Sequence, residues 1–285
     1  MRNCGLENAV YRIYKIALDA FYDFNEDDGW AIASHIALSV LMALFPFLIF
    51  VTALAAFFGT KELADQTALL LLEAWPKEVA EPIAAAIHDV LTNLRTDAIT
   101  FGVVFAVYFS SSGIEGLRVG LNRAYGVRET NPWWWMRIES VLYVFVGAIS
   151  LLALAFLIVL GPLIWATATK YAPWLTPFAG VANLIRYGLT TFVLVIALIV
   201  VHKWLPAGRR SFTEIAPGII VTLVLWIAAG ALFGSYLSEF AHTYVTYYAG
   251  LASAMVALVF LYVTASIFVY GGELNSVIRK HQHGR

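Results

Sequence analysis

Polar and ionisable side chains recur at helical spacing inside otherwise apolar stretches of this 285-residue sequence. Four of them, Ser111, Glu115, Arg118 and Asn122, fall on one face of a helix that turns about 100° per residue. In hydrocarbon each polar group needs a partner or water. The stripe therefore predicts either a polar cavity within the membrane or an ion pair that reaches the membrane interface.

Two further stripes have the same spacing. On the first apolar stretch, His35 and Ser39 share a face with Pro46, which leaves the carbonyl of Met42 without its helical donor. The last stretch carries a third stripe, formed by Tyr262, Ser266, Tyr270 and Glu273. Because His35, Glu115 and Glu273 are expected at similar depth, we predict that the three stripes line one cavity open to the cytoplasm.

A second polar group is expected toward the opposite side of the membrane. Arg186 lies roughly 9 Å into its apolar stretch at 1.5 Å per residue. Glu239 and His242 share a face at the outer end of the next stretch. Opposite charges at matching depth predict an ion pair between Arg186 and Glu239, with either a structural role or a role as a gate. His35 has two comparable interpretations, a packed bundle histidine and a proton-handling site.

The sequence lacks the clusters that hydrolytic chemistry requires. Metal-dependent hydrolysis needs grouped His, Asp or Glu ligands, whereas the histidines at 35, 88, 202 and 242 are isolated and the one His-x-His pair, His281 and His283, lies in the terminal tail. No GxSxG or Walker A motif is present, and a single cysteine, Cys4, cannot form an intrachain disulfide. We predict no catalytic residue, no metal and no cofactor.

The elements that position these residues are membrane helices. Hydrophobic residues make up 61% of the chain and charged residues 13%, against about 25% charged residues in soluble domains. A helix crosses the ~30 Å hydrocarbon layer in about 20 residues. We therefore expect an all-α, polytopic membrane protein with six transmembrane helices, at 31–58, 98–118, 140–166, 180–202, 214–240 and 249–272. A net charge of -1 gives no support to a nucleic-acid partner.

Positive charges indicate the orientation. Thirteen Lys and Arg residues lie in the two tails and the even-numbered loops, and four lie on the other side, so both termini are expected in the cytoplasm. Residues 1–28 predict an amphipathic interfacial helix, 29–275 the transmembrane domain and 276–285 a cytoplasmic tail. The outer loop, 60–97, repeats apolar residues every three or four positions and predicts a short amphipathic helix. Gly116 and Gly120 form a GxxxG pair, weak evidence for a dimer.

Several strings resemble the YihY/BrkB family of bacterial inner-membrane proteins, some of which have carried a ribonuclease BN-like label. They are LFP at 44–46, LNRAYGV at 121–127 followed by Pro132 and Trp133, APG at 216–218 and GGELN at 271–275. The resemblance covers nearly the whole chain and implies six transmembrane helices, cytoplasmic termini and a bacterial plasma-membrane location. The positions that match the motifs are Asn122, Arg123, Tyr125, Gly126, Pro217, Gly218, Glu273 and Asn275. Where relatives usually have an aromatic pair, this chain has Ser34, His35 and Ile36.

Three classes of function remain. The first is transport of a lipid, another amphiphile or a small solute through the polar cavity, since short or proline-interrupted helices often mark transporter sites. The second is a non-catalytic scaffold for an envelope assembly, which would dock a protein partner through the basic, Trp-rich loop at 128–137 or the acidic outer loop. The third, a nuclease, conflicts with the missing ligand clusters. Membrane lipids are the expected partners, and a slot open sideways to lipid would indicate lipid cargo.

Overall fold

The computed structural model describes residues 2–58, 96–155, 161–248 and 252–282, and the regular secondary structure among them is helical, with no strand. The helices are α1 (Arg2–Glu26), α2 (Gly29–Phe58), α5 (Thr96–Ala124), α6 (Trp133–Ala155), α7 (Gly161–Tyr171), the 3-10 helix η2 (Pro173–Phe178), α8 (Ala179–Trp204), α9 (Phe212–Tyr248) and α10 (Ala252–Gln282). Four segments of the described chain are long and apolar enough to span a membrane: Trp133–Leu154, Pro173–Trp204, Phe212–Leu237 and Ala254–Gln282. The protein is a multi-pass, all-α membrane protein.

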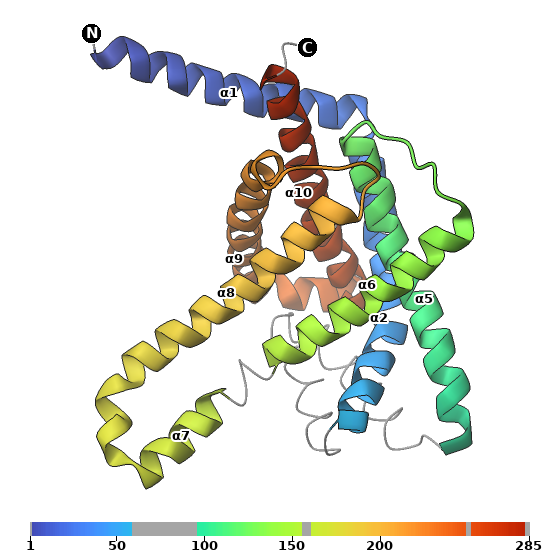
Figure 1. Ribbon diagram of the computed structural model, residues 1–285, viewed down its shortest axis with the longest axis vertical. Helices are drawn as coiled ribbons and strands as arrows, with labels where there is room; N and C mark the ends of the chain where they lie inside the picture. Colours follow the sequence, from blue (N-terminus) through green and yellow to red (C-terminus); the bar gives the residue numbers. More distant parts are fainter. Residues whose placement is uncertain (1, 59–95, 156–160, 249–251, 283–285) are drawn as a thin grey trace.

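Helix α10 is the centre of the arrangement and packs against α1, α2, α5 and α9. Helix α1 lies across the end of the molecule at which α10 finishes (Figure 1). Three polar contacts among the described residues fasten α1 there: a 2.6 Å ion pair between Lys280 Nζ and Asp23 Oδ2, a 3.1 Å contact between His281 Nε2 and Asp19 Oδ2, and a hydrogen bond from the Tyr270 hydroxyl to the carbonyl of Ala17. Residues Arg2–Glu26 therefore form a helix that is tied to the C-terminal helix.

Small residues let the central helices approach closely. On α5, Cβ atoms added at Gly113 and Gly116 would lie 3.2 Å from the Cβ atoms of Ala43 and Ser39 on α2, and one added at Gly120 would lie 2.6 Å from Ile36. The GxxxG pair therefore packs α5 against α2 within the chain, the contact for which small residues are favoured in membranes.

Several helices end beyond the expected boundaries. Helix α5 continues past 118 to Ala124, where Gly126 takes a φ of +60° and the N–H of Val127 donates to the Asn122 carbonyl over 2.9 Å. This is the glycine cap that commonly ends helices. Helices α9 and α10 run past 240 and 272. The third predicted span, 140–166, falls on α6 up to Ala155 and on α7 from Gly161, and the residues between them lie outside the described part. Charged residues mark the limit of the hydrocarbon, but they do not stop a helix.

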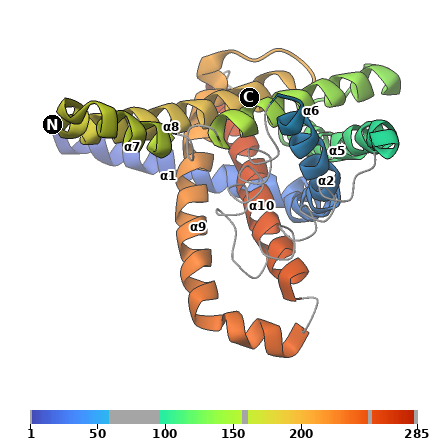
Figure 2. The ribbon, with the colours of Figure 1, turned by 90° about the horizontal axis from the view of Figure 1, so that it is seen from below.

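Helix α8 diverges from the other helices. Its only buried residues are Leu198 and His202, both near its C-terminal end. In two perpendicular views its N-terminal half and α7 lie on the side of the molecule away from α2 and α5 (Figures 1 and 2). A fork therefore opens where α8 leaves α2, α9 and α10.

The structure tests the predicted outer loop and the first two predicted spans only in part. The amphipathic helix predicted for the outer loop, 60–97, lies outside the described residues apart from the start of α5. Within the described residues, α2 contributes an apolar stretch over Gly29–Leu44, and α5 is not among the four candidate spans.

Candidate functional site

A buried polar cluster joins the ends of four helices. We call Tyr125, His202, Arg210 and Asn275 the Tyr125 cluster. The Tyr125 hydroxyl lies 3.2 Å from His202 Nδ1 on α8 and accepts a hydrogen bond from Asn275 Nδ2 on α10 over 3.1 Å. Asn275 Oδ1 accepts from the backbone N–H of Gly218 on α9 over 2.7 Å. The motif residues Tyr125, Gly218 and Asn275 thus meet at one place.

The network assigns the protons of the cluster. Because Asn275 Oδ1 accepts from Gly218, the amide Nδ2 must be the donor to Tyr125. The Tyr125 O–H is then free to donate to His202 Nδ1, so the hydrogen of the neutral imidazole lies on Nε2. His202 is 0% exposed, and within the described structure Nε2 has no hydrogen-bond partner. The cluster therefore presents a buried N–H donor that is not satisfied.

Arg210 covers the other side of Tyr125. Its guanidinium lies 3.9 Å from the centre of the Tyr125 ring and donates to the carbonyls of Pro206 and Ala207. Burial raises the pKa of the Tyr125 phenol above its usual value, although the Asn275 hydrogen bond and the Arg210 charge oppose this shift. Burial also lowers the pKa of Arg210. The phenol therefore keeps its proton at neutral pH and remains a donor.

Tyr125→Phe tests this network. The change removes the hydroxyl and leaves His202 Nδ1 and one Asn275 N–H unpaired, and each unpaired buried group costs about 1–3 kcal/mol. We expect a loss of about 2 kcal/mol, measured by thermal unfolding in detergent. Tyr187→Phe, at an exposed tyrosine whose ring still stacks on Arg186, is the control and should be neutral. Equal stability of the two variants would show that the cluster does not stabilise the fold.

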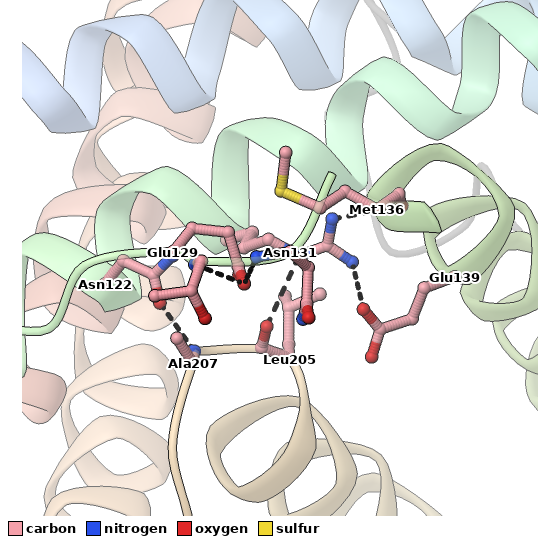
Figure 3. Close-up of polar contacts among 9 residues, drawn as sticks. Asn122, Glu129, Asn131, Met136, Glu139, Leu205 and Ala207 are labelled. Carbon is pink, nitrogen blue, oxygen red and sulfur yellow. Dashed lines mark hydrogen bonds and ion pairs between the residues drawn. The ribbon is translucent and has the colours of Figure 1, made fainter. Parts of the chain in front are cut away.

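Arg118 binds three elements together. Its side chain is 4% exposed, and it donates to the carbonyl of Leu205, to the carbonyl of Met136 over 3.0 Å and to Glu139 Oε2 over 3.0 Å. One turn further along α5, Asn122 Oδ1 accepts from the backbone N–H of Ala207 over 2.7 Å. Figure 3 shows these contacts joining α5, α6 and the segment after α8. Arg118 and Asn122 thereby position the C-terminal end of α8.

Glu115 also forms an ion pair with a residue of α6. Its carboxylate forms a 2.7 Å ion pair with Arg137 Nη1, and the Arg137 guanidinium lies over the Tyr108 ring. Ser111 is buried and donates to the carbonyl of Tyr108. The stripe on α5 therefore faces α6 and the chain after α8, and Glu115 and Arg118 pair with residues of α6.

The three predicted stripes do not meet in the described structure. His35 on α2 is exposed, whereas the neighbouring Ser39 packs against Gly116. On α10, Tyr262 lies beside Trp30 and Ser266 donates to the carbonyl of Tyr262. His35 is exposed, Glu115 pairs with Arg137 of α6, and Glu273 has no hydrogen-bond partner within the described ranges. No hydrogen bond or ion pair therefore joins any two of these residues in the part of the chain that is described.

Glu273 is buried on the side of α10 that faces α1. It is 1% exposed, and neither carboxylate oxygen has a hydrogen-bond partner among the described residues. Its charged neighbours are Asp23, Asp27, Lys280 and Arg123. A buried carboxyl without a hydrogen-bond partner is a functional candidate in a membrane helix.

The predicted outer pair is not formed. Arg186 stacks on the ring of Tyr187 at 4.6 Å, Glu239 is exposed, and no ion pair joins them in the described residues. The side chain of His242 lies outside the described part. The described residues also contain no group of three His, Cys, Asp or Glu side chains that could hold a metal.

An apolar cavity of about 290 Å³ lies at the fork where α8 leaves the other helices. We call it the fork cavity. Helices α2, α5, α8, α9 and α10 all contribute to its wall, which includes Ile36, Val40, Leu198, Val201, Trp226 and Phe268. The His202 ring packs against Phe268, with 4.8 Å between ring centroids. The fork cavity therefore ends beside the Tyr125 cluster.

Sequence reasoning did not identify His202, Arg210 or the fork cavity. One signal for His202 was its position one helical turn after Leu198, which places both residues on a single face of α8. The cavity itself depends on the divergence of α8, and no periodicity within a single helix encodes such a divergence.

Comparisons with known proteins place the chain among bacterial membrane proteins. The sequence model of the family described as virulence factor BrkB matches residues 20–285. The putative ribonuclease-like protein YfkH of Bacillus subtilis is 26% identical over 265 residues, 93% of this chain and 95% of YfkH. A UPF0761 membrane protein of Coxiella burnetii is 25% identical over 277 residues, 94% of this chain and 96% of the relative.

One further relative is longer than this chain. The UPF0761 membrane protein RC1_0578 of Rhodospirillum centenum is 22% identical over 92% of this chain, and the match spans 57% of that relative. No solved structure matches the chain.

Proposed function

We propose, since this chain belongs to the family described as virulence factor BrkB, that this integral membrane protein binds an amphiphile with an apolar chain and moves it between the two leaflets. The observation that carries the proposal is the fork cavity. Its volume of about 290 Å³ is just below the range for ligand pockets, about 300–1,000 Å³.

The wall of the fork cavity favours an apolar ligand. Its side chains are aliphatic or aromatic apart from Thr264, and the Thr264 hydroxyl already donates to the carbonyl of Phe260. An ion or a polar solute would lose its hydration there without gaining hydrogen bonds. A hydrocarbon chain has no such hydration to lose. The apolar wall therefore favours a lipid or another amphiphile over a small polar solute as the cargo.

Lateral access supports a lipid as the amphiphile. Leu194, which lines the fork cavity from α8, is 42% exposed. The N-terminal half of α8 lies away from α2 and α5 (Figure 1). An acyl chain of the surrounding bilayer can therefore reach the cavity sideways.

The finer topology belongs to the same proposal. We expect α2 and α5 to supply two crossings in addition to the four candidate spans, which makes six crossings with both termini in the cytoplasm. Helix α1 would then lie on the inner membrane surface, where exposed aromatic side chains such as Tyr11, Tyr14 and Tyr22 suit the interface.

Ala197→Trp tests the proposal by filling the fork cavity. Ala197 lines the cavity from α8, whereas its neighbour Ile196 does not and is 43% exposed. In liposomes that contain a fluorescent lipid, we expect Ala197→Trp to lower the transbilayer movement of the lipid at least tenfold. Ile196→Trp adds an indole to the same helix on another face and should keep the wild-type rate.

Two results would overturn this proposal. Wild-type protein that moves no lipid would exclude transport. Equal rates in the Ala197→Trp and Ile196→Trp variants, both correctly folded, would show that lipid movement does not use the fork cavity.

A further inference from the structure

A second apolar cavity lies beside the fork cavity along α9 and α10. Its volume is about 180 Å³, and its wall consists of Trp226, Ala229, Gly230, Phe233, Phe260, Val263 and Thr264. Trp226 and Thr264 line both cavities. We call this second space the α9–α10 cavity.

The two cavities lie side by side at one level of α10. On this helix the fork cavity is lined from Leu261 to Phe268 and the α9–α10 cavity from Phe260 to Thr264. Their lining residues overlap in depth and occupy neighbouring faces of α10. An apolar chain therefore passes from one cavity to the other only beside the side chains that line both, Trp226 and Thr264.

The Trp226 indole stands at the boundary between the two cavities. Its N–H donates to the carbonyl of Thr264 on α10 over 3.0 Å, which fixes the ring between the helices. Gly230, one turn further along α9, lines the α9–α10 cavity, and an added Cβ there would meet no atom within 4 Å. The Trp226 side chain therefore stands between the two apolar volumes.

We propose that Trp226 determines the length of the acyl chain that this protein accepts, because its indole closes the fork cavity where the α9–α10 cavity begins. This inference rests on the proposed binding of an amphiphile and assigns a specificity residue to that site. A short chain fills the fork cavity and stops at the indole. A longer chain enters the α9–α10 cavity only when the indole is removed.

The experiment measures the binding of octanoyl, lauroyl and palmitoyl lysophosphatidylcholine to the purified full-length protein in detergent. For wild type we expect affinity to rise with chain length and then level off once the fork cavity is full. For Trp226→Ala we expect the rise to continue to the palmitoyl chain, because each further buried methylene strengthens binding about fourfold. Trp226→Phe keeps a ring at the boundary and should retain the wild-type limit.

A second substitution in the α9–α10 cavity separates its role from general loosening. Gly230→Leu fills this cavity and, combined with Trp226→Ala, should abolish the gain for the palmitoyl chain. Gly234→Leu is the matched control, since Gly234 is one turn further along α9, has equally open surroundings and does not line either cavity. It should leave the gain intact.

The outcomes distinguish this inference from the proposed function. If wild type binds none of the three lipids, the proposed function itself fails. If wild type binds them and Trp226→Ala shows the same chain-length profile, or if Gly230→Leu and Gly234→Leu act alike, amphiphile binding stands and Trp226 does not set the chain length.

Discussion

Replacing Gly218 with leucine is expected to separate α9 from α10 and to cost about 3 kcal/mol of stability, the upper end of the range for overpacking. A Cβ at position 218 would lie 2.5 Å from Asn275 Nδ2 and 2.6 Å from Asn275 Cγ, and it would also collide with the Gly271 carbonyl. Backbone cannot move aside as the end of a flexible side chain can. The substitution would also displace Asn275, which bonds both the Gly218 N–H and the Tyr125 hydroxyl.

Thermal unfolding and size-exclusion profiles in detergent measure this effect. Gly188→Leu is the control, because an added Cβ on that part of α8 meets no atom within 4 Å, and it should change stability little. Gly218→Ala should give an intermediate loss. A Gly218→Leu protein as stable as Gly188→Leu would contradict the close crossing of α9 and α10.

The membrane character of the chain could be predicted from sequence, because it has too few charged residues to cover a surface exposed to water. The family resemblance was equally accessible, and the BrkB family match confirms it. The helix ends were not accessible, because they depend on local caps such as Gly126 with its φ of +60°. A membrane boundary and a helix boundary are set by different interactions, and charge reports only the first.

The direction in which each stripe points depends on how its helix packs. On α5, the glycines at 113, 116 and 120 lie roughly 160° around the helix from the stripe of Glu115 and Arg118. Because these glycines pack against α2, the stripe must face away from α2, and it reaches α6. The stripe of α5 therefore could not join the stripe of α2, and the glycine spacing was the signal that separated them.

The residues that hold α8 link the polar contacts to the fork cavity. Arg118 and Asn122 fix the backbone at Leu205 and Ala207, and the Tyr125 cluster holds His202 one helical turn before that point. The rest of α8 is free to diverge. Polar residues that the sequence suggested as a transport path thus act on the other side of α5, as the anchor of the helix that opens the cavity.

Arg118→Met is expected to cost about 3–5 kcal/mol, the loss typical of a broken buried ion pair. The substitution keeps the length of the side chain but leaves Glu139 without its partner and the carbonyls of Met136 and Leu205 without their donor. Because the Glu139 side chain is 32% exposed, water compensates part of the loss, so we expect a value near 3 kcal/mol. Arg186→Met removes an arginine that stacks on a surface tyrosine of α8 and should cost less than about 1 kcal/mol.

A double-mutant cycle with Glu139→Gln isolates the pair. Glutamine removes the charge and keeps an acceptor, so Glu139→Gln alone should cost about 1 kcal/mol, and the double variant should be more stable than the sum of the single losses predicts. The same proteins report on α8, since spin labels on α8 and α10 should show a broader distance distribution in Arg118→Met than in Arg186→Met. Additive losses with unchanged distances would mean that Arg118 neither pairs with Glu139 in the membrane nor positions the helix that forms the fork cavity.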